Sequence, residues 1–104
     1  MACKITVLKR MINADLAEEY IANPVTPCPF FQDGQEFITP SLEKPAGFCD
    51  WAWNDIHKVI VTLRRGGNFS DGMFEGWMKN DTSMIACCTD GVRPVVFKIE
   101  EVEG

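Results

Sequence analysis

One amphipathic stripe between positions 50 and 65 constrains the fold more than any other feature of the chain. Its apolar residues recur at the three- and four-residue spacing that places side chains on one face of an α-helix. Arg64 and Arg65 would lie at the negative end of the helix dipole, and Gly66–Gly67 would end the helix. The pattern predicts a helix from Asp50 to Arg64 or Arg65 that packs on a sheet, with Asp50 as its N-cap. The stripe consists of Ala52, Ile56, Val59, Ile60 and Leu63.

The first third of the chain predicts a strand, a short helix and a second strand. Residues Cys3 to Lys9 alternate between apolar and polar, which is typical of a half-buried strand. Asn13 is a suitable N-cap for a helix from about Ala14 to Ala22, with Leu16 and Tyr20 on its apolar face. Asn23–Pro24 ends this helix, because the residue before proline avoids helical angles. A short strand from Gln35 to Thr39 is expected after the turn at Asp33–Gly34.

The last third of the chain predicts a hairpin of residues 83–88 and 92–102. With Asp90–Gly91 as the central residues of a type I′ turn, Cys88 opposes Arg93 across the two strands. Alternation then turns Cys88 toward the core and Cys87 outward. The first and last strands are expected to pair, because both are long and amphipathic.

These elements predict one α+β domain over residues 1–104. Its sheet is small and antiparallel, and either stays open or curls into a partial barrel, with one long packed helix and one short helix. A hydrophobic fraction of 46% beside 24% charged residues is that of a globular protein and not of a disordered one.

Charge and targeting signals narrow the function classes. A formal net charge of −5 argues against non-specific binding to nucleic acid or to an anionic membrane surface, both of which attract clustered lysine and arginine. No segment resembles a signal peptide or reaches the length of a membrane span. A cytoplasmic location is expected, where the five cysteines would stay reduced.

Three cysteines, Cys28, Cys49 and Cys88, lie at junctions where side chains can converge on one rim. Cys28 is clamped between two prolines, and Cys49 precedes the long helix, whose free amides favour a thiolate. Arg93 would support Cys88 in the same way. Packing is the competing interpretation, because free cysteine is among the most buried residue types. The packing interpretation is favoured more strongly for Cys3 and Cys87 than for these three cysteines.

A metal site at Cys28, Cys49 and Cys88 is one interpretation of these thiols. Zinc or iron would then be held by the three thiolates with His57 or water as the fourth ligand. The chain lacks the paired cysteines at two-residue spacing that such sites usually contain.

Two further residues of the long helix are candidates for the same site. Trp51 could form an aromatic wall for a ligand, although packing in the core or at an interface is the commoner role of such a residue. His57, the only histidine, could act as a general base if it reaches the Cys49 thiol. Otherwise it is a packing residue beside Trp53. No complete catalytic constellation is apparent, so the catalytic residues are unknown.

A glycine-rich segment between Gly66 and Gly76 contains large apolar side chains. Phe69, Phe74 and Trp77 exceed what so small a core readily buries. We therefore expect a homo-oligomer, most simply a dimer.

Four motifs resemble a family of short, uncharacterised prokaryotic proteins common in anaerobes. They are Cys28–Pro29 before Gly34, the run Gly-Phe-Cys-Asp-Trp-Ala-Trp at 47–53, Gly66–Gly67, and the run Cys-Cys-Thr-Asp-Gly-Val-Arg-Pro-Val at 87–95. The resemblance extends from Lys4 to about Glu101. It implies no catalytic role. It does imply a cytosolic protein from an anaerobe, a setting that favours reduced thiols and oxygen-sensitive chemistry.

Three functions follow from the sequence. The first is a non-catalytic interaction or oligomeric subunit whose cysteines merely pack. The second is a module that binds a metal or small ligand through Cys28, Cys49 and Cys88. The third is a cysteine-dependent enzyme that uses Cys49 with His57.

Overall fold

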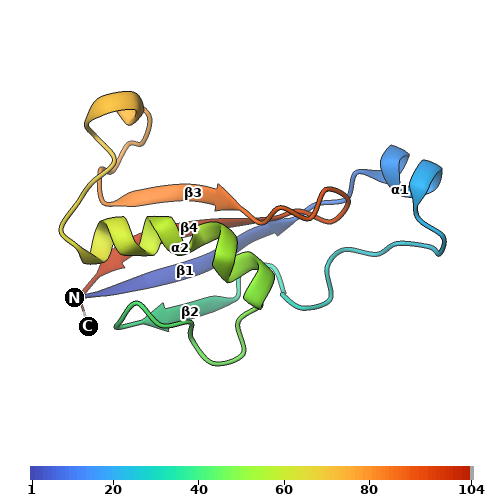
Figure 1. Cartoon of the computed structure of the whole chain (residues 1–104), viewed down its shortest axis with the longest axis horizontal. Helices are drawn as coiled ribbons and strands as arrows, with labels where there is room; N and C mark the ends of the chain where they lie inside the picture. The colour runs from blue at the N-terminus through green and yellow to red at the C-terminus, as the bar shows by residue number, and fades with distance from the viewer. Residues whose placement is uncertain (104) are drawn as a thin grey trace.

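Four strands form one open antiparallel sheet in the computed structural model, which describes residues 1–103 (Figure 1). The strand order is β2-β1-β4-β3, so the first and last strands pair in the centre of the sheet as predicted. No pairing joins the outer strands within residues 1–103, and the partial barrel is therefore not formed. The α+β class is confirmed. The strands are β1 (Ala2–Arg10), β2 (Glu36–Thr39), β3 (Ser83–Cys87) and β4 (Val95–Val102).

The long helix α2 (Asp50–Arg64) lies across one face of this sheet (Figure 1). All five residues of the predicted stripe are buried there, against the inward side chains of β1, β3 and β4. The N-cap is Cys49 and not Asp50. The Asp50 carboxylate instead forms an ion pair of 2.7 Å with Lys44, so it does not cap the helix.

Two glycines end α2 by a specific hydrogen-bond pattern. Gly66 adopts a φ of +81°, which an L side chain rarely adopts, and its N–H donates to the carbonyl of Leu63 at 3.1 Å. Gly67 donates to the carbonyl of Thr62 at 2.8 Å, and a Cβ atom there would lie 2.9 Å from that oxygen. This is a Schellman motif, in which the last free carbonyls of the helix are satisfied.

The short helix α1 (Ala14–Tyr20) stands away from the sheet at the end of an arm (Figure 1). It is two residues shorter than predicted and buries none of its side chains, so Leu16 and Tyr20 do not contribute to the core. Asn13 is the N-cap by position. Its side chain does not cap the helix, because its amide donates to the carbonyl of Gly91 at 2.7 Å.

The hairpin register differs from the sequence prediction by two residues. Ala86 is paired with Phe97 and Cys87 with Val96, so the connection from β3 to β4 is longer than a two-residue turn. The Asp90 carboxylate accounts for the difference, because it accepts hydrogen bonds from the backbone of Val92 and Arg93. A shift of two leaves every side chain on its predicted face. Cys88 is buried and Cys87 exposed, as expected.

Phenylalanine rings fill the end of the core near the start of α2. Phe31 and Phe48 have ring centroids 5.1 Å apart, and each also contacts Phe37 and Phe97. The irregular segment after α2 is covered only in part. It contains the 3-10 turn η1 (Gly72–Phe74), and Phe69 is buried against Phe74, whereas Trp77 remains 69% exposed.

None of the helices within residues 1–103 combines the length and the apolar character needed to cross a bilayer.

Candidate functional site

A cavity of about 550 Å³ lies between the start of α2, the segment at 28–31 and the β3–β4 connection. All three predicted thiols line it, although they are distant in sequence. Trp51 and Arg93 line it as well, so five of the six predicted ligand-binding residues share one space. The remaining lining residues are Pro29, Phe30, Phe31, Ala52, Thr89, Asp90, Gly91 and Val95.

Cys28 is brought to the cavity by a contact between its backbone and β1. Its prolyl neighbours fix the local backbone, because proline has little freedom in φ. The Arg10 guanidinium donates to the Cys28 carbonyl at 3.2 Å and to the carboxylate of Asp33 at 3.1 Å. Arg10 thereby attaches both ends of the loop that carries Cys28 to the end of β1.

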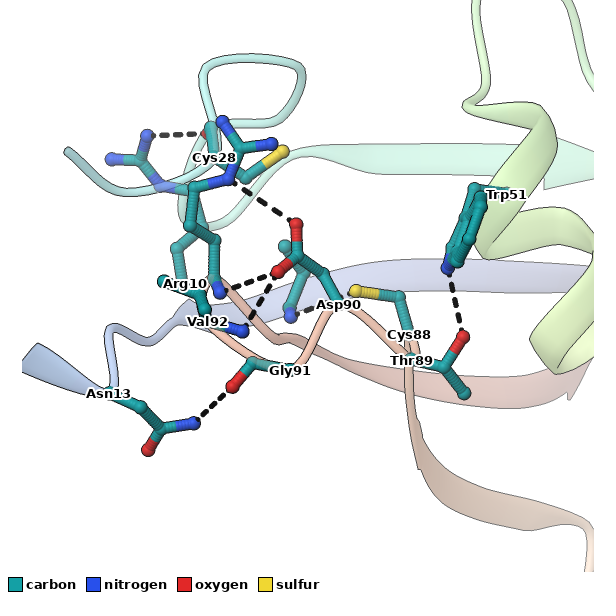
Figure 2. Close-up of polar contacts among 11 residues, drawn as sticks. Arg10, Asn13, Cys28, Trp51, Cys88, Thr89, Asp90, Gly91 and Val92 are labelled. Atoms are coloured by element: carbon teal, nitrogen blue, oxygen red, sulfur yellow. Dashed lines mark hydrogen bonds and ion pairs between the residues drawn. The ribbon is translucent and has the colours of Figure 1, made fainter. Parts of the chain in front are cut away.

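Cys49 and Trp51 reach the cavity from the first turn of α2. The Trp51 indole N–H donates a 2.8 Å hydrogen bond to the hydroxyl oxygen of Thr89 (Figure 2). The Asp55 carboxylate, one turn later, accepts from the backbone N–H of Thr89 at 2.7 Å and from its hydroxyl at 3.0 Å. The helix start and the β3–β4 connection are therefore joined along one rim of the cavity.

Cys88 enters the cavity from the end of β3. Its sulfur accepts a hydrogen bond from the Val95 backbone N–H at 3.3 Å, and its own N–H donates to the Val95 carbonyl at 3.0 Å. Figure 2 shows the sulfur on the side of the chain that faces Asp90, turned away from Trp51. A backbone donor directed at sulfur holds the thiol in one orientation.

Asp90 organises the loop that carries Arg93. Its carboxylate accepts from the N–H of Val92 at 2.9 Å and from that of Arg93 at 2.8 Å, and it pairs with the Arg93 side chain at 3.3 Å (Figure 2). Burial by itself would raise the pKa of Asp90, but these donors outweigh it and the pKa is lowered. Arg93 thus faces Asp90 and is not the cross-strand neighbour of Cys88.

Cys3 and Cys87 lie outside the cavity. Burial raises the pKa of the Cys3 thiol, and burial also raises the pKa of Cys87, with further contributions from the nearby Cys88 and Asp55. Both groups are therefore held in the neutral form to higher pH. All five cysteines are free thiols in the structure.

His57 is placed apart from the thiols. Its ring packs against Trp53 at 5.2 Å, and its Nε2 lies 3.2 Å from the Leu42 carbonyl. It does not line the cavity that contains Cys49. Eight residues separate the two positions, which is a rise of about 12 Å along a helix. The structure therefore does not bring Cys49 and His57 together as nucleophile and base.

No three histidine, cysteine, aspartate or glutamate side chains within residues 1–103 are placed so that they could hold a metal ion. Cys28, Cys49 and Cys88 share a cavity but do not form the close cluster that zinc or iron requires. The thiols can still act as single soft contacts for a ligand that fills the space between them.

Sequence reasoning missed three residues of this site: Asp55, Thr89 and Asp90. Asp55 follows Trp51 by four residues, which places both on one face of α2. Thr89 and Asp90 precede Gly91, and such residues commonly bind backbone groups in turns. That spacing and that turn composition were the available signals.

Neither family models, nor curated proteins, nor solved structures gave a match to this chain.

Proposed function

We propose that this protein is a non-catalytic module that binds a small, largely apolar ligand in the cavity shared by Cys28, Cys49 and Cys88. The observation that carries the proposal is the convergence of three thiols from three separate segments with Trp51 and Arg93. Chance packing of single cysteines would not require them to line the same open space. A cavity of this size is also within the range that accommodates small molecules.

The lining favours a planar ligand with one anionic group. Trp51 is 65% exposed although its indole N–H is hydrogen-bonded, so its ring is fixed while a face remains accessible. Phe30, also exposed, adds a second aromatic side chain. Arg93 supplies the positive charge of the lining. Its Nε pairs with the carboxylate of Asp90, which also lines the cavity, so an anionic group would bind the terminal nitrogens of the guanidinium. The thiols add polarisable contacts that suit an aromatic ring.

The proposed setting is the cytoplasm, in line with the family resemblance of the four motifs. A reducing compartment would keep all five thiols in the free form that the structure has.

Site-resolved alkylation tests the proposal with an internal control. The protein is treated with N-ethylmaleimide in the presence and absence of 1-anilinonaphthalene-8-sulfonate, an aromatic anion that serves as the probe. We expect the probe to slow modification of Cys28 and Cys49 at least several-fold and to leave the exposed Cys87 unchanged. Equal protection of all thiols, or none, would contradict the proposal.

Two variants locate the binding of that probe. Trp51→Ala should weaken the fluorescence-detected affinity about tenfold or more, because it removes the aromatic wall. Trp77→Ala removes an equally exposed tryptophan outside the cavity and should leave the affinity unchanged. Equal losses in both variants would mean that the probe binds exposed aromatic side chains in general.

A second candidate function is an interaction subunit, and exposed apolar side chains favour it. Met73 is 90% exposed near Trp77, and α1 buries none of its side chains. Such surfaces are usual where another macromolecule binds. Hydrogen exchange measured on the protein at low and high concentration tests this candidate. Protection that appears at α1 or at 72–78 only at high concentration supports it, and its absence counts against it.

A further inference from the structure

A second cavity, of about 350 Å³, adjoins the cavity that contains the three thiols. Pro29, Asp90 and Arg93 line both cavities and therefore form the boundary between them. Among the described residues, no thiol and no aromatic side chain lines the second cavity. We call the two spaces the thiol cavity and the aliphatic cavity. The other residues that line the aliphatic cavity are Ile21, Asn23, Pro24, Val25, Thr26 and Val92.

Hydrogen bonds hold the two sides of the aliphatic cavity in place. On one side, the Asn13 side-chain amide donates to the carbonyl of Gly91 at 2.7 Å (Figure 2). On the other side, the Arg10 guanidinium donates to the carbonyl of Cys28, directly before Pro29. Both donors lie at the end of β1 or just after it. The β3–β4 connection and the proline-rich segment are therefore attached to the same part of the chain, with the cavity between them.

The Arg93 guanidinium has unengaged nitrogens at the boundary between the two cavities. Its Nε pairs with the Asp90 carboxylate at 3.3 Å, whereas within residues 1–103 no hydrogen bond or ion pair involves its two terminal nitrogens. The Arg93 side chain is 40% exposed, so a ligand can reach it. The planar guanidinium presents parallel N–H groups that suit a carboxylate. A carboxylate bound there would have one cavity on either side.

We propose that the ligand is a carboxylate that carries an aromatic group and an aliphatic chain, as an N-acylated aromatic amino acid does. This inference rests on the proposed function of the thiol cavity and names the class of ligand that the site takes. The carboxylate binds Arg93, the aromatic ring lies against Trp51 in the thiol cavity, and the aliphatic chain lies against Val25 in the aliphatic cavity. Each cavity has a volume in the range of small-molecule sites, about 300–1,000 Å³. Removal of the ring and the chain from water favours binding.

Isothermal titration calorimetry with two compounds tests the proposal. N-acetylphenylalanine has the ring and the carboxylate, and N-octanoylphenylalanine has the long aliphatic chain as well. The longer compound should bind the wild-type protein about tenfold more tightly or better, because its chain leaves water. Equal affinities would overturn this ligand class and leave the thiol cavity as a binding site. Absence of binding by both compounds would also overturn it, and the anilinonaphthalene probe then decides whether the thiol cavity binds ligands at all.

Matched variants locate the aliphatic chain. Val25→Asn should reduce the advantage of the longer compound at least several-fold and leave the affinity for N-acetylphenylalanine unchanged, which also shows that the variant is folded. Ile38→Asn alters an exposed residue outside both cavities and should change neither affinity. If Val25→Asn does not fold, Thr26→Asp replaces it, at an exposed position that lines the same cavity. Equal effects inside and outside the cavity would mean that the chain binds apolar surface in general, and would overturn the proposal.

A neutral analogue tests the role of Arg93. In N-octanoylphenylalaninamide a carboxamide replaces the carboxylate. The wild type should bind the acid about tenfold more tightly than the amide, because charge-assisted hydrogen bonds are the stronger ones. Arg93→Gln should bind the two compounds alike. A preference for the acid that survives in Arg93→Gln would place the carboxylate elsewhere and contradict the proposal.

Discussion

The indole nitrogen of Trp51 lies 2.8 Å from the hydroxyl oxygen of Thr89, and this bond joins the first turn of α2 to the β3–β4 connection. The same hydroxyl donates to the Asp55 carboxylate, which lies one turn along the helix from Trp51. Thr89 therefore connects an exposed aromatic ring with a charge on the same helix. The shape of the cavity rim depends on this contact.

A double-mutant cycle measures that contact. Trp51→Phe and Thr89→Val should each lower the free energy of unfolding by about 1 kcal/mol, because each removes hydrogen-bonding groups at a partly exposed site. The double variant should lose less than the sum of the two, with a coupling of about 0.5 kcal/mol or more. Urea unfolding followed by circular dichroism gives all four values. Strict additivity would show that the two side chains do not interact in solution.

Asp90 should make stability depend on pH in the acidic range. Its folded pKa lies below the ordinary value of 3.8, so the unfolded chain takes up the proton first as pH falls. The contribution of the Asp90 carboxylate to the free energy of unfolding is fully present above the pKa of the unfolded chain, and it is lost as pH falls through the pKa of the folded protein.

The Asp90→Asn variant isolates this contribution. The stability difference between wild type and Asp90→Asn should be constant above about pH 5 and shrink below the ordinary value of 3.8. Thermal unfolding of both proteins between pH 2.5 and 7 provides the comparison. A difference that grows on acidification would have the opposite sign and would contradict the lowered pKa.

Phe31 should be among the most costly core residues to truncate. It is buried, and its ring contacts those of Phe37, Phe48 and Phe97. Phe31→Ala should destabilise the protein by about 3–5 kcal/mol through lost burial and the space left behind. The adjacent Phe30 is exposed, so Phe30→Ala is a matched control and should cost about 1 kcal/mol or less. Equal losses would mean that the aromatic cluster is not packed as described.

Cys87 should alkylate slowly near neutral pH although it is exposed. Because burial of its sulfur, with Cys88 and Asp55 nearby, raises its pKa, little thiolate is present there. The rate of reaction with iodoacetamide at this residue, resolved by mass spectrometry, should rise with a midpoint above the ordinary thiol value of 9.0. A midpoint below 9.0 would show that the thiolate is stabilised instead.

The long helix α2 was predictable because every sequence signal that specifies it lies within the helix or directly after it. The stripe, the basic last turn and the two glycines all act within one segment, and Asp50–Arg64 was predicted to within one residue at either end. The faces of Cys87 and Cys88 were predictable for a similar reason, since strand alternation survives an even shift of register. The register of β3 against β4 was not predictable, because the Asp90 side chain accepts hydrogen bonds from the backbone of Val92 and Arg93 and so replaces the expected two-residue turn.

The composition of the candidate site was predictable only in part. Junction positions pointed to Cys28, Cys49 and Cys88, but their convergence depends on the path of the proline-rich loop. Arg10 fixes that path through a carbonyl eighteen positions away, and no local pattern specifies such a contact. His57 does not reach Cys49 because eight residues separate the two positions, which is about 12 Å of rise along the helix, and this distance follows from the sequence once the bounds of α2 are known.

The unburied arm has a consequence for cleavage of the chain. A helix that buries no side chain opens at little cost in free energy, so a protease should cut within α1 before it reaches the sheet. The excised β1 segment would still lie between β2 and β4, held by hydrogen bonds on both sides. The two pieces should therefore stay together as a noncovalent complex, and the nicked protein should reassemble from its separated fragments.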